Sequence, residues 1–277
     1  MMENEEIKES KSLGAGAWIL ISVVLIYLLI LMIAPIAALI AGTLRDGIAG
    51  LLAALVNTDF HTSFLLTLKI SLLVTIIQAV LGTITAWVLA RQDFIAKNIL
   101  NGMIDVPFAV SPVVVGYMLL LLFGRNSFLG PILSQLGIRI AFAIPGMVLA
   151  TLFVTLPFMI REMIPVIRGL DRRQELAAAT LGASEWTIFW RVTFPALRTG
   201  LIYGMTLTLA RALGEFGAVL VIGGGAQGQT ETATLYIYRA LEERQYVGAY
   251  SAALLIGLCT VILVAVADWL RHRSMSK

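Results

Sequence analysis

Charge is scarce in this sequence. Only 13% of its 277 residues are Asp, Glu, Lys or Arg, whereas 59% are hydrophobic, and the mean hydropathy is +0.90. A water-soluble domain of this length carries roughly twice that share of charged residues, because its surface must be hydrated. The composition therefore excludes an ordinary soluble fold and indicates a protein that lies in a membrane.

Reactive side chains are also few. The single cysteine, Cys259, has no second thiol with which to form a disulfide within the chain. The two histidines, His61 and His272, are expected on opposite sides of the membrane, so no metal cluster is predicted. No phosphate-binding Gly-Lys-Ser/Thr motif and no nucleophile–base set stands out. We therefore predict a non-catalytic chain without a metal or cofactor of its own.

Six apolar runs account for the hydrophobicity. Each is long enough for the helix of about 20 residues that crosses a bilayer, and none alternates as the strands of a membrane barrel do. The runs cover residues 12–44, 70–90, 106–124, 140–160, 199–230 and 245–267. We therefore predict an all-α membrane protein with six transmembrane helices.

The basic residues predict the orientation of these helices. With both termini in the cytoplasm, thirteen Lys and Arg residues fall in inner segments and five in outer ones, as the positive-inside rule requires. The first run follows an acidic leader, unlike a cleaved signal peptide, so we expect it to be retained. The predicted domains are a cytoplasmic tail over 1–13, a membrane domain over 14–270 and a cytoplasmic tail over 271–277. The basic isoelectric point, about 9.1, follows from this topology and requires no nucleic acid.

The connections between the runs carry some signals of their own. The short turn 91–98 predicts that the second and third spans are antiparallel neighbours. Gly130 and Pro131 predict an irregular outer loop over residues 125–139.

The inner segment between the fourth and fifth runs, about residues 161–198, is longer than a simple connection needs. Residues 174–181 are rich in Ala and Leu and predict a short helix, which Gly182 would end. Ser184 is expected to cap a second short helix, and Pro195 to stop it.

Small and aromatic residues divide between these two expected helices. Ala177, Ala178 and Gly182 would let another backbone approach closely. The three aromatic residues within 186–190 fall at positions i, i+3 and i+4, so they share a face that could anchor the element to its own bundle. The pattern suits a docking element on the inner surface, and a loop that packs only on its own helices is the alternative.

Four residues are candidates for lining a passage through the membrane. Arg211 and Glu215 stand four apart, which places them on one helix face, where they can pair. A charge at membrane depth costs roughly 3 kcal/mol and usually faces the bundle interior, so the pair either borders an anion path or fixes helix packing. Pro107 and Pro112 interrupt the third run, with Ser111 between them, and such breaks either line the passage or only kink the helix.

The inner segment resembles the cytoplasmic signature of ABC importer permeases. That signature reads Glu-Ala-Ala, three residues, Gly, nine residues, an aliphatic residue, one residue, and Leu-Pro. The residues that fall at its positions are Ala177, Ala178, Gly182, Val192, Phe194 and Pro195. Leu176 stands where the signature has Glu, and Glu175 lies one residue earlier, so it would point in the same direction only after a local rotation of about 100°.

Further segments extend the resemblance over roughly residues 60–260. Residues 105–114, 145–148, 161–162 and 211–218 are similar to sulfate/thiosulfate permeases, above all to their W-type subunits. Molybdate permeases share the segment 211–218, so a molybdate or tungstate permease is the alternative. The additional first span favours sulfate.

The resemblance implies a type I ABC importer permease fold with cytoplasmic coupling helices, in the bacterial cytoplasmic membrane. The chain would form half of the passage beside a second, related permease. An extracytoplasmic sulfate-binding protein would deliver the anion, and two copies of a separate ATPase would bind ATP-Mg and dock inside. The implied docking residues are Glu175, Ala177, Ala178, Gly182, Ala183, Ser184 and Pro195.

Two interpretations from other classes remain open at this point. An ion-coupled secondary anion carrier would act without an ATPase, and it leaves the long inner segment unexplained. A membrane enzyme would need a reactive constellation.

Overall fold

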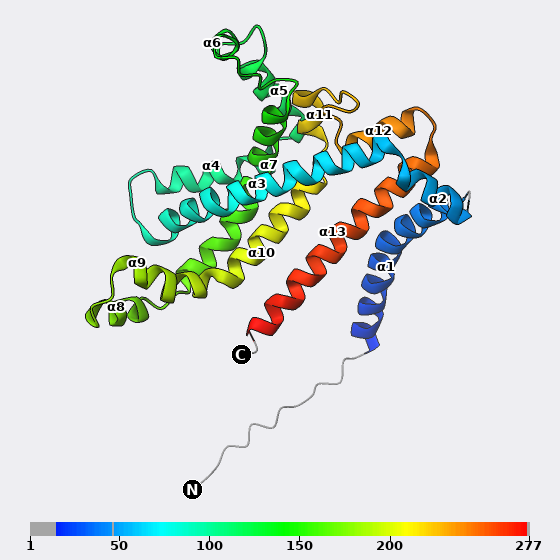
Figure 1. The fold of residues 1–277 in the computed structure, drawn as a ribbon. Coiled ribbons are helices and arrows are strands. Elements are labelled where there is room, and N and C mark those ends of the chain that lie inside the picture. The colour runs from blue at the N-terminus through cyan, green and yellow to red at the C-terminus, as the bar shows by residue number, and fades with distance from the viewer. Residues whose placement is uncertain (1–14, 46, 276–277) are drawn as a thin grey trace.

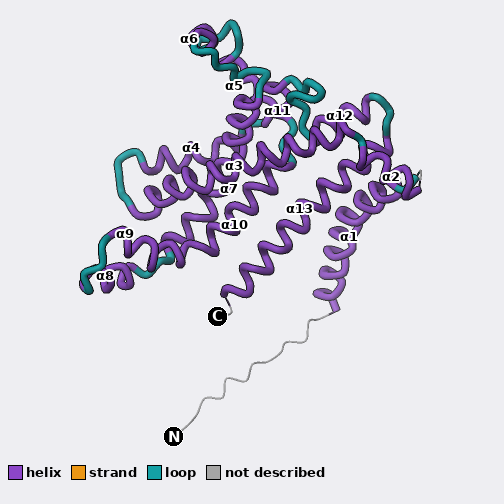
Figure 2. Tube along the Cα trace, viewed as in Figure 1, coloured by secondary structure: helices purple, strands orange, loops and turns teal. Residues whose placement is uncertain are grey.

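The computed structural model describes residues 15–45 and 47–275, with side chains from 16 to 269 among them. Throughout this described part the regular elements are helices, joined by turns and short loops (Figure 2). The predicted tail over 1–13 lies outside the described residues. Of the predicted tail over 271–277, the backbone to Met275 continues the last helix.

Four of the described helices are long and apolar enough to cross a membrane alone. They are α1 (Ala15–Thr43), α3 (Thr58–Arg91), α7 (Ile144–Arg168) and α13 (Tyr246–Met275). Two bent pairs bring the number to as many as six: α4 (Lys97–Ala109) with α5 (Pro112–Phe123), and α10 (Phe194–Leu213) with α11 (Gly217–Gly223). The prediction of an all-α membrane fold is confirmed in this form.

The shorter helices lie at the two ends of the bundle. They are α2 (Gly47–Val56), α6 (Gly130–Gln135), α8 (Arg172–Thr180), α9 (Glu185–Ile188) and α12 (Ala233–Glu242). Figure 1 places α8 and α9 on the same side as the start of α1 and the end of α13, with α2, α6 and α12 on the opposite side. We call these the α8 side and the α6 side. A chain that crosses a membrane an even number of times begins and ends on the same side, which is where the start of α1 and the end of α13 lie.

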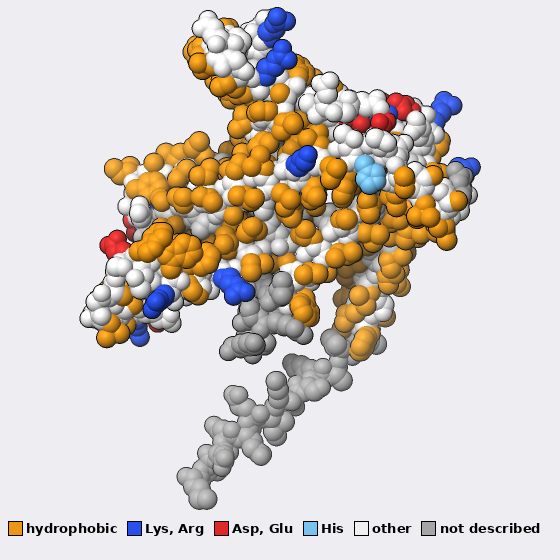
Figure 3. All heavy atoms as spheres, viewed as in Figure 1, with side chains coloured by type: hydrophobic (Ala, Val, Ile, Leu, Met, Phe, Trp, Pro, Cys, Tyr) orange, Lys and Arg blue, Asp and Glu red, His pale blue; other side chains and the backbone are white. Residues whose placement is uncertain are grey.

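The core consists of α3, α7 and α10, which pack against one another. Small residues allow the close approach that drives association in lipid. A Cβ atom at Gly82 of α3 would lie 2.9 Å from Met159 Cγ of α7, and one at Gly200 of α10 would lie 2.6 Å from Val166 Cγ2. Outside this core, hydrophobic side chains cover much of the molecular surface between the two sides, as contact with lipid requires (Figure 3).

The third apolar run does not form one straight span. Its two halves, α4 and α5, meet at an angle of 111°. Pro112 begins α5, and Ser111 before it is extended, with φ −58° and ψ 136°, because a residue before proline is excluded from the helical region. Pro107 lies within α4 without ending it. The break therefore occurs at Ser111 and Pro112 and forms a sharp turn, which is compatible with both sequence interpretations.

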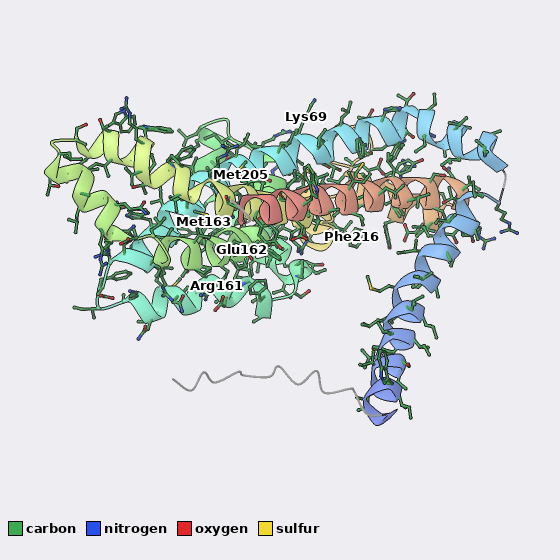
Figure 4. All side chains as sticks on the ribbon, turned by 90° about the horizontal axis from the view of Figure 1, so that it is seen from below. Lys69, Arg161, Glu162, Met163, Met205 and Phe216 are labelled. Atoms are coloured by element: carbon green, nitrogen blue, oxygen red, sulfur yellow. The ribbon has the colours of Figure 1, made fainter. Side chains whose placement is uncertain are left out.

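An ion pair holds α4 against α7. Arg161 Nε donates to Asp105 Oδ1 at 2.9 Å, and Arg161 Nη1 donates to Asn101 Oδ1 at 2.9 Å. Arg161 lies near one edge of the bundle in Figure 4, on the opposite edge from Lys69 of α3. Helix α4 packs mainly against α7, and its Ile104 also belongs to the buried apolar cluster that contains Ala86 and Leu89 of α3.

The segment after α5 also differs from its prediction. Gly130 and Pro131 begin the helix α6 where the sequence predicted an irregular loop. Proline is well tolerated in the first turn of a helix, since the N–H that it lacks would have no partner there. The prediction read Pro131 as a breaker, whereas its position makes it an initiator.

The second helices of the two broken spans, α5 and α11, pack against each other at a glycine. We predict that Gly116→Leu lowers stability by about 2 kcal/mol, or roughly 5 °C in Tm, because overpacking forces the backbones apart. A Cβ atom at Gly116 would lie 2.7 Å from Val221 Cβ and 2.8 Å from the Ala218 carbonyl oxygen. Thermal unfolding of the purified protein in detergent measures the change.

Gly102→Leu in α4 is the matched control, because no atom lies within 4 Å of the added Cβ. Both variants replace a helical glycine by the same residue. Equal Tm values for the two would contradict the close α5–α11 contact.

Candidate functional site

The helix α8 has a defined start and end. The Asp171 side chain accepts from Arg173 N at 2.9 Å and caps its first turn. At the other end Gly182 has φ +83°, its N–H donates to Ala179 O at 2.9 Å, and Ala183 N donates to Ala178 O at 3.1 Å. This pair of hydrogen bonds is the Schellman motif, which favours glycine at this position. The prediction that Gly182 ends the helix is confirmed.

The second short helix begins as the sequence predicts. Ser184 is extended, its hydroxyl accepts from Thr187 N at 3.3 Å, and Glu185 lies in the first turn of α9. A side-chain oxygen and an acidic residue at this end satisfy free N–H groups and the positive end of the helix dipole.

Pro195 does not stop the helix, contrary to the sequence prediction. Helical structure is continuous from Glu185 to Leu213, because a π-helical turn over Phe189–Thr193 joins α9 to α10. Phe194 N donates to Phe189 O across this wider turn. Proline follows one residue later, among the first positions of α10, where its missing N–H is accommodated within the widened turn.

The aromatic face of this helix is not buried against the bundle. Trp186 is 71% exposed, and Trp190 is 46% exposed. The rings contact one another instead, with Trp190 and Phe194 centroids 4.9 Å apart. The expectation that this face anchors the element to its own bundle is therefore wrong for the isolated chain, and the α8 side presents an aromatic surface.

Part of the exposed surface of α8 and of the turn after it is formed by small and apolar residues. Leu176 is 64% exposed, Ala177 is exposed, and no atom lies within 4 Å of a Cβ built at Gly182. Ala178 and Ala183 are half-buried behind them. The structure thus gathers the predicted docking residues on the α8 side, except that Pro195 lies in the following helix.

Glu175 turns toward the protein and ties α8 to the end of α3. Arg91 Nη1 donates to Glu175 Oε2 at 2.8 Å, and Nη2 donates to Oε1 at 3.1 Å. The Thr193 hydroxyl donates to the same carboxylate at 3.0 Å. The Arg91 guanidinium also lies over the Trp87 ring, 4.7 Å from its centroid. Glu175 therefore joins three elements of its own chain, α3, α8 and the π turn.

Arg211 and Glu215 pair across a break rather than along a helix. The helix α10 ends at Leu213, and Glu215 lies in the turn before α11, which is bent by 59° from α10. Arg211 Nη1 lies 2.8 Å from Glu215 Oε2, and Ala218 N donates to Glu215 Oε1 at 3.0 Å. The carboxylate of Glu215, which is 2% exposed, thus caps the start of α11. Its negative charge is neutralised by the guanidinium of Arg211 in the last turn of α10.

The two broken spans meet. A Cβ atom at Gly217, the first residue of α11, would lie 3.3 Å from Pro112 Cβ at the start of α5. The predicted passage residues Ser111, Pro112, Arg211 and Glu215 therefore cluster around two adjacent breaks, one from each span. The docking and passage residues occupy separate regions, which the continuous helix over Glu185–Leu213 connects.

Sequence reasoning missed a charged cluster on the α6 side. Arg239 Nε donates to Glu231 Oε1 at 2.6 Å, and its guanidinium also pairs with Asp59 and Glu243. The hydrogen bond that Arg239 donates to the Glu231 carboxylate raises the pKa of Arg239 above its usual value. The spacing of Glu243 four residues after Arg239 signals part of this cluster, but the contact with Asp59 at the start of α3 has no local signal.

The described residues thus form a helical membrane bundle with an exposed helix–turn–helix on one side and two adjacent broken spans. A solved structure, of a bacterial ABC transporter involved in the import of the acidic polysaccharide alginate, superposes with a TM-score of 0.74 at 17% identity, over 92% of this chain and 96% of that chain. This likeness shows the fold.

Residues 78–275 match the family model for the binding-protein-dependent transport system inner membrane component, and the chain belongs to that family. The chain is 42% identical over 265 residues to the sulfate transport system permease protein CysW of Synechococcus elongatus, covering 95% of this chain and 92% of that one. It is 39% identical over 257 residues to the protein of the same name from Synechocystis sp., covering 93% of each. Family membership confirms the prediction of a non-catalytic permease subunit.

The Arg91–Glu175 pair is expected to hold α8 in place. Arg91→Ala should lower the local stability of α8 by about 2 kcal/mol, because it removes two charge-assisted hydrogen bonds and leaves the carboxylate without its cation. Amide hydrogen exchange in α8 should then become faster by about 30-fold.

Arg172→Ala is the control for this prediction, since the Arg172 side chain makes a single, long hydrogen bond among the described residues, from Nη2 to Arg91 O at 3.4 Å. The reversed pair, Arg91→Glu with Glu175→Arg, should recover part of the protection. Unchanged exchange in Arg91→Ala would show that α8 does not depend on the pair.

The Arg211–Glu215 pair allows packing and passage roles to be separated. Arg211→Leu alone should impair assembly, because it leaves a buried carboxylate unpaired. Arg211→Leu with Glu215→Gln is neutral and keeps an oxygen that can accept from Ala218 N. Assembly is measured by size-exclusion chromatography, and transport by uptake into proteoliposomes.

We expect the double variant to recover assembly but not transport, because a residue that borders the passage is needed for transport even when assembly is normal. Recovery of both would assign the pair to helix packing alone.

Proposed function

We propose that this chain is the W-type half of a sulfate/thiosulfate importer in the bacterial cytoplasmic membrane. The observation that carries the proposal is the similarity to sulfate permeases over more than nine tenths of this chain and of each relative. In the proposed complex, a second, related permease forms the other half of the passage. An extracytoplasmic sulfate-binding protein delivers the anion, and two copies of an ATPase bind ATP-Mg.

The α8 side is proposed to face the cytoplasm. Segments on this side contain most of the basic residues, which favours the cytoplasmic face. The ATPase is proposed to dock on α8 and the turn that follows it. Ala177, Ala178 and Gly182 leave room for its backbone, with Ala183 and Ser184 beside them and Leu176 as an apolar contact. The exposed aromatic face of α9 lies next to this surface.

Glu175 has a different part in this proposal. Its carboxylate is bound to Arg91 and Thr193, so we assign it to positioning α8 rather than to direct contact with the ATPase. Movement of the docked ATPase would then reach α3 through the ion pair and α10 through the continuous helix. Both helices belong to the core, so the docking element is mechanically connected to the bundle.

The passage is proposed to open and close at the two broken spans. The far end of α10 is the bend held by Arg211 and Glu215, and α11 beyond it contacts the start of α5 at Pro112. A tilt of α10 would move these breaks relative to the second permease. ATP binding would turn the passage outward and hydrolysis would reset it inward, while this chain contributes conformational change and no bond chemistry.

Uptake of labelled sulfate tests the proposal. Proteoliposomes would contain this chain, the related permease and the ATPase, with binding protein outside, and thiosulfate or molybdate would be added as competitors. We expect uptake that requires ATP and is blocked by thiosulfate but not by molybdate. Uptake of labelled molybdate in place of sulfate would reassign the substrate, and uptake without ATPase would contradict the importer class.

A bulky residue on α8 tests the docking surface. Ala177→Trp should weaken retention of the ATPase during purification by about tenfold or more, because the indole occupies the space of the approaching backbone. Ala177 is exposed, so the chain itself should still fold and insert.

Ala179→Trp is the control, since Ala179 is also exposed but points about 200° around the helix from Ala177. Gly182→Trp is less informative, because φ +83° strains any side chain at this position. Normal ATPase retention by Ala177→Trp would contradict the assignment.

A further inference from the structure

The segment from Phe123 to Phe142, which we call the α6 cap, stands out from the bundle on the α6 side (Figure 1). Its two ends are fixed by hydrogen bonds. The Ser127 hydroxyl donates to Leu122 O at 2.8 Å, and Phe142 N donates to Ile222 O of α11 at 2.7 Å. The cap therefore has a defined shape and is attached to α5 and α11, the two segments that meet at the breaks.

A cavity opens within the α6 cap. It has a volume of about 630 Å³, and its lining includes Arg125, Arg139, Leu133 and Phe142. A tetrahedral oxyanion is only about as large as two or three water molecules, each of which occupies about 30 Å³. Pockets of several hundred Å³ accommodate larger ligands, such as several side chains of a protein segment. The size thus favours a protruding segment over a free anion.

The charges of the α6 cap are unbalanced. Between Asp105 and Glu162 the sequence contains no acidic residue. Arg125 and Arg139 are both exposed, and neither has an ion-pair or hydrogen-bond partner among the described residues. On the same side, Arg239 is by contrast neutralised by three carboxylates. Figure 3 shows basic side chains on the cap and acidic ones toward α12.

Apolar side chains surround the two free arginines. Phe128 is 84% exposed, and Ile132, Leu136 and Phe142 are exposed as well. Exposed apolar residues that rim basic groups are typical of a protein interaction site, because the apolar contacts provide affinity and the charges provide orientation. A partner that complements this surface must itself combine carboxylates with apolar residues.

We propose that the α6 cap is a docking surface for an acidic, partly apolar segment of the extracytoplasmic binding protein. Carboxylates of that segment pair with Arg125 and Arg139, and its apolar side chains enter the cavity. The inference rests on the proposed function, in which such a protein delivers the anion. Because the cap is bonded to α11 through Phe142 and Ile222, docking there acts directly on a segment beside the passage.

The test uses the full complex in proteoliposomes and measures ATP hydrolysis as binding protein is added. Arg125→Glu with Arg139→Glu should raise the binding-protein concentration for half-maximal stimulation by about tenfold, because two attractive contacts become repulsive. The same concentration should increase with salt in the wild type and much less in the variant, since salt screens exposed charges. Arg125→Lys with Arg139→Lys should stay near the wild type.

Arg45→Glu is the matched control, because Arg45 is also an exposed arginine on the α6 side but lies at the end of α1. It should leave the half-maximal concentration unchanged. An equal shift in Arg45→Glu would reduce the effect to general charge and overturn the inference, and so would wild-type stimulation of the double Glu variant.

Two further measurements distinguish a segment of the binding protein from other possible occupants of the cavity. If free sulfate without binding protein stimulated the wild type and not the double Glu variant, the cavity would be an anion site and the inference would be overturned. If the effect of the variant vanished in vesicles made only of neutral lipid, an anionic headgroup would be the occupant. Failure of the proposed function has a distinct signature, because binding protein would then not stimulate even the wild-type complex.

Discussion

Backbone hydrogen bonding in lipid is the constraint on which this structure depends. Hydrocarbon offers no partner for a free N–H or carbonyl group, so every interruption of a helix must be enclosed by protein. Within the part of the chain that the structure describes, two such interruptions occur inside spans, at Ser111 and at Gly214 to Phe216, and they lie side by side. Glu215 supplies the acceptor that the start of α11 lacks. The breaks can thus coexist with a membrane because they support each other.

Charged residues follow the same logic of local neutralisation. Three ion pairs join elements that the apolar core would hold only loosely: Arg91 with Glu175, Arg161 with Asp105, and Arg211 with Glu215. Arg91 lies at the end of α3 and Glu215 at the bend before α11, whereas Arg161 and Asp105 join α7 and α4 within their lengths. Arg125 and Arg139 of the α6 cap have no such partner among the described residues, and both line the apolar cavity on the α6 side.

Composition and run length were sufficient to predict the helical membrane fold, because the thickness of the bilayer sets the length of a span. Local signals also predicted the end of α8 at Gly182 and the cap at Ser184, since both depend on backbone geometry within a few residues. Proline was predicted correctly at Pro112, where the third run is interrupted, and misread at Pro131 and Pro195. Its effect depends on whether it begins a helix, as at Pro112 and Pro131, or follows a widened turn, as at Pro195. Long-range pairs such as Arg91 with Glu175 had no local signature.

The unbroken helix over Glu185–Leu213 has a mechanical consequence. Its 29 residues make a rod about 40 Å long, since each helical residue adds about 1.5 Å. One end carries the exposed aromatic rings and the other ends at the bend before α11. Pivoting such a rod by about 5° displaces its tip by roughly 3 to 4 Å, the breadth of a water molecule. A rotation small enough to preserve the packing of α10 is thus large enough to admit or exclude solvent at its far end.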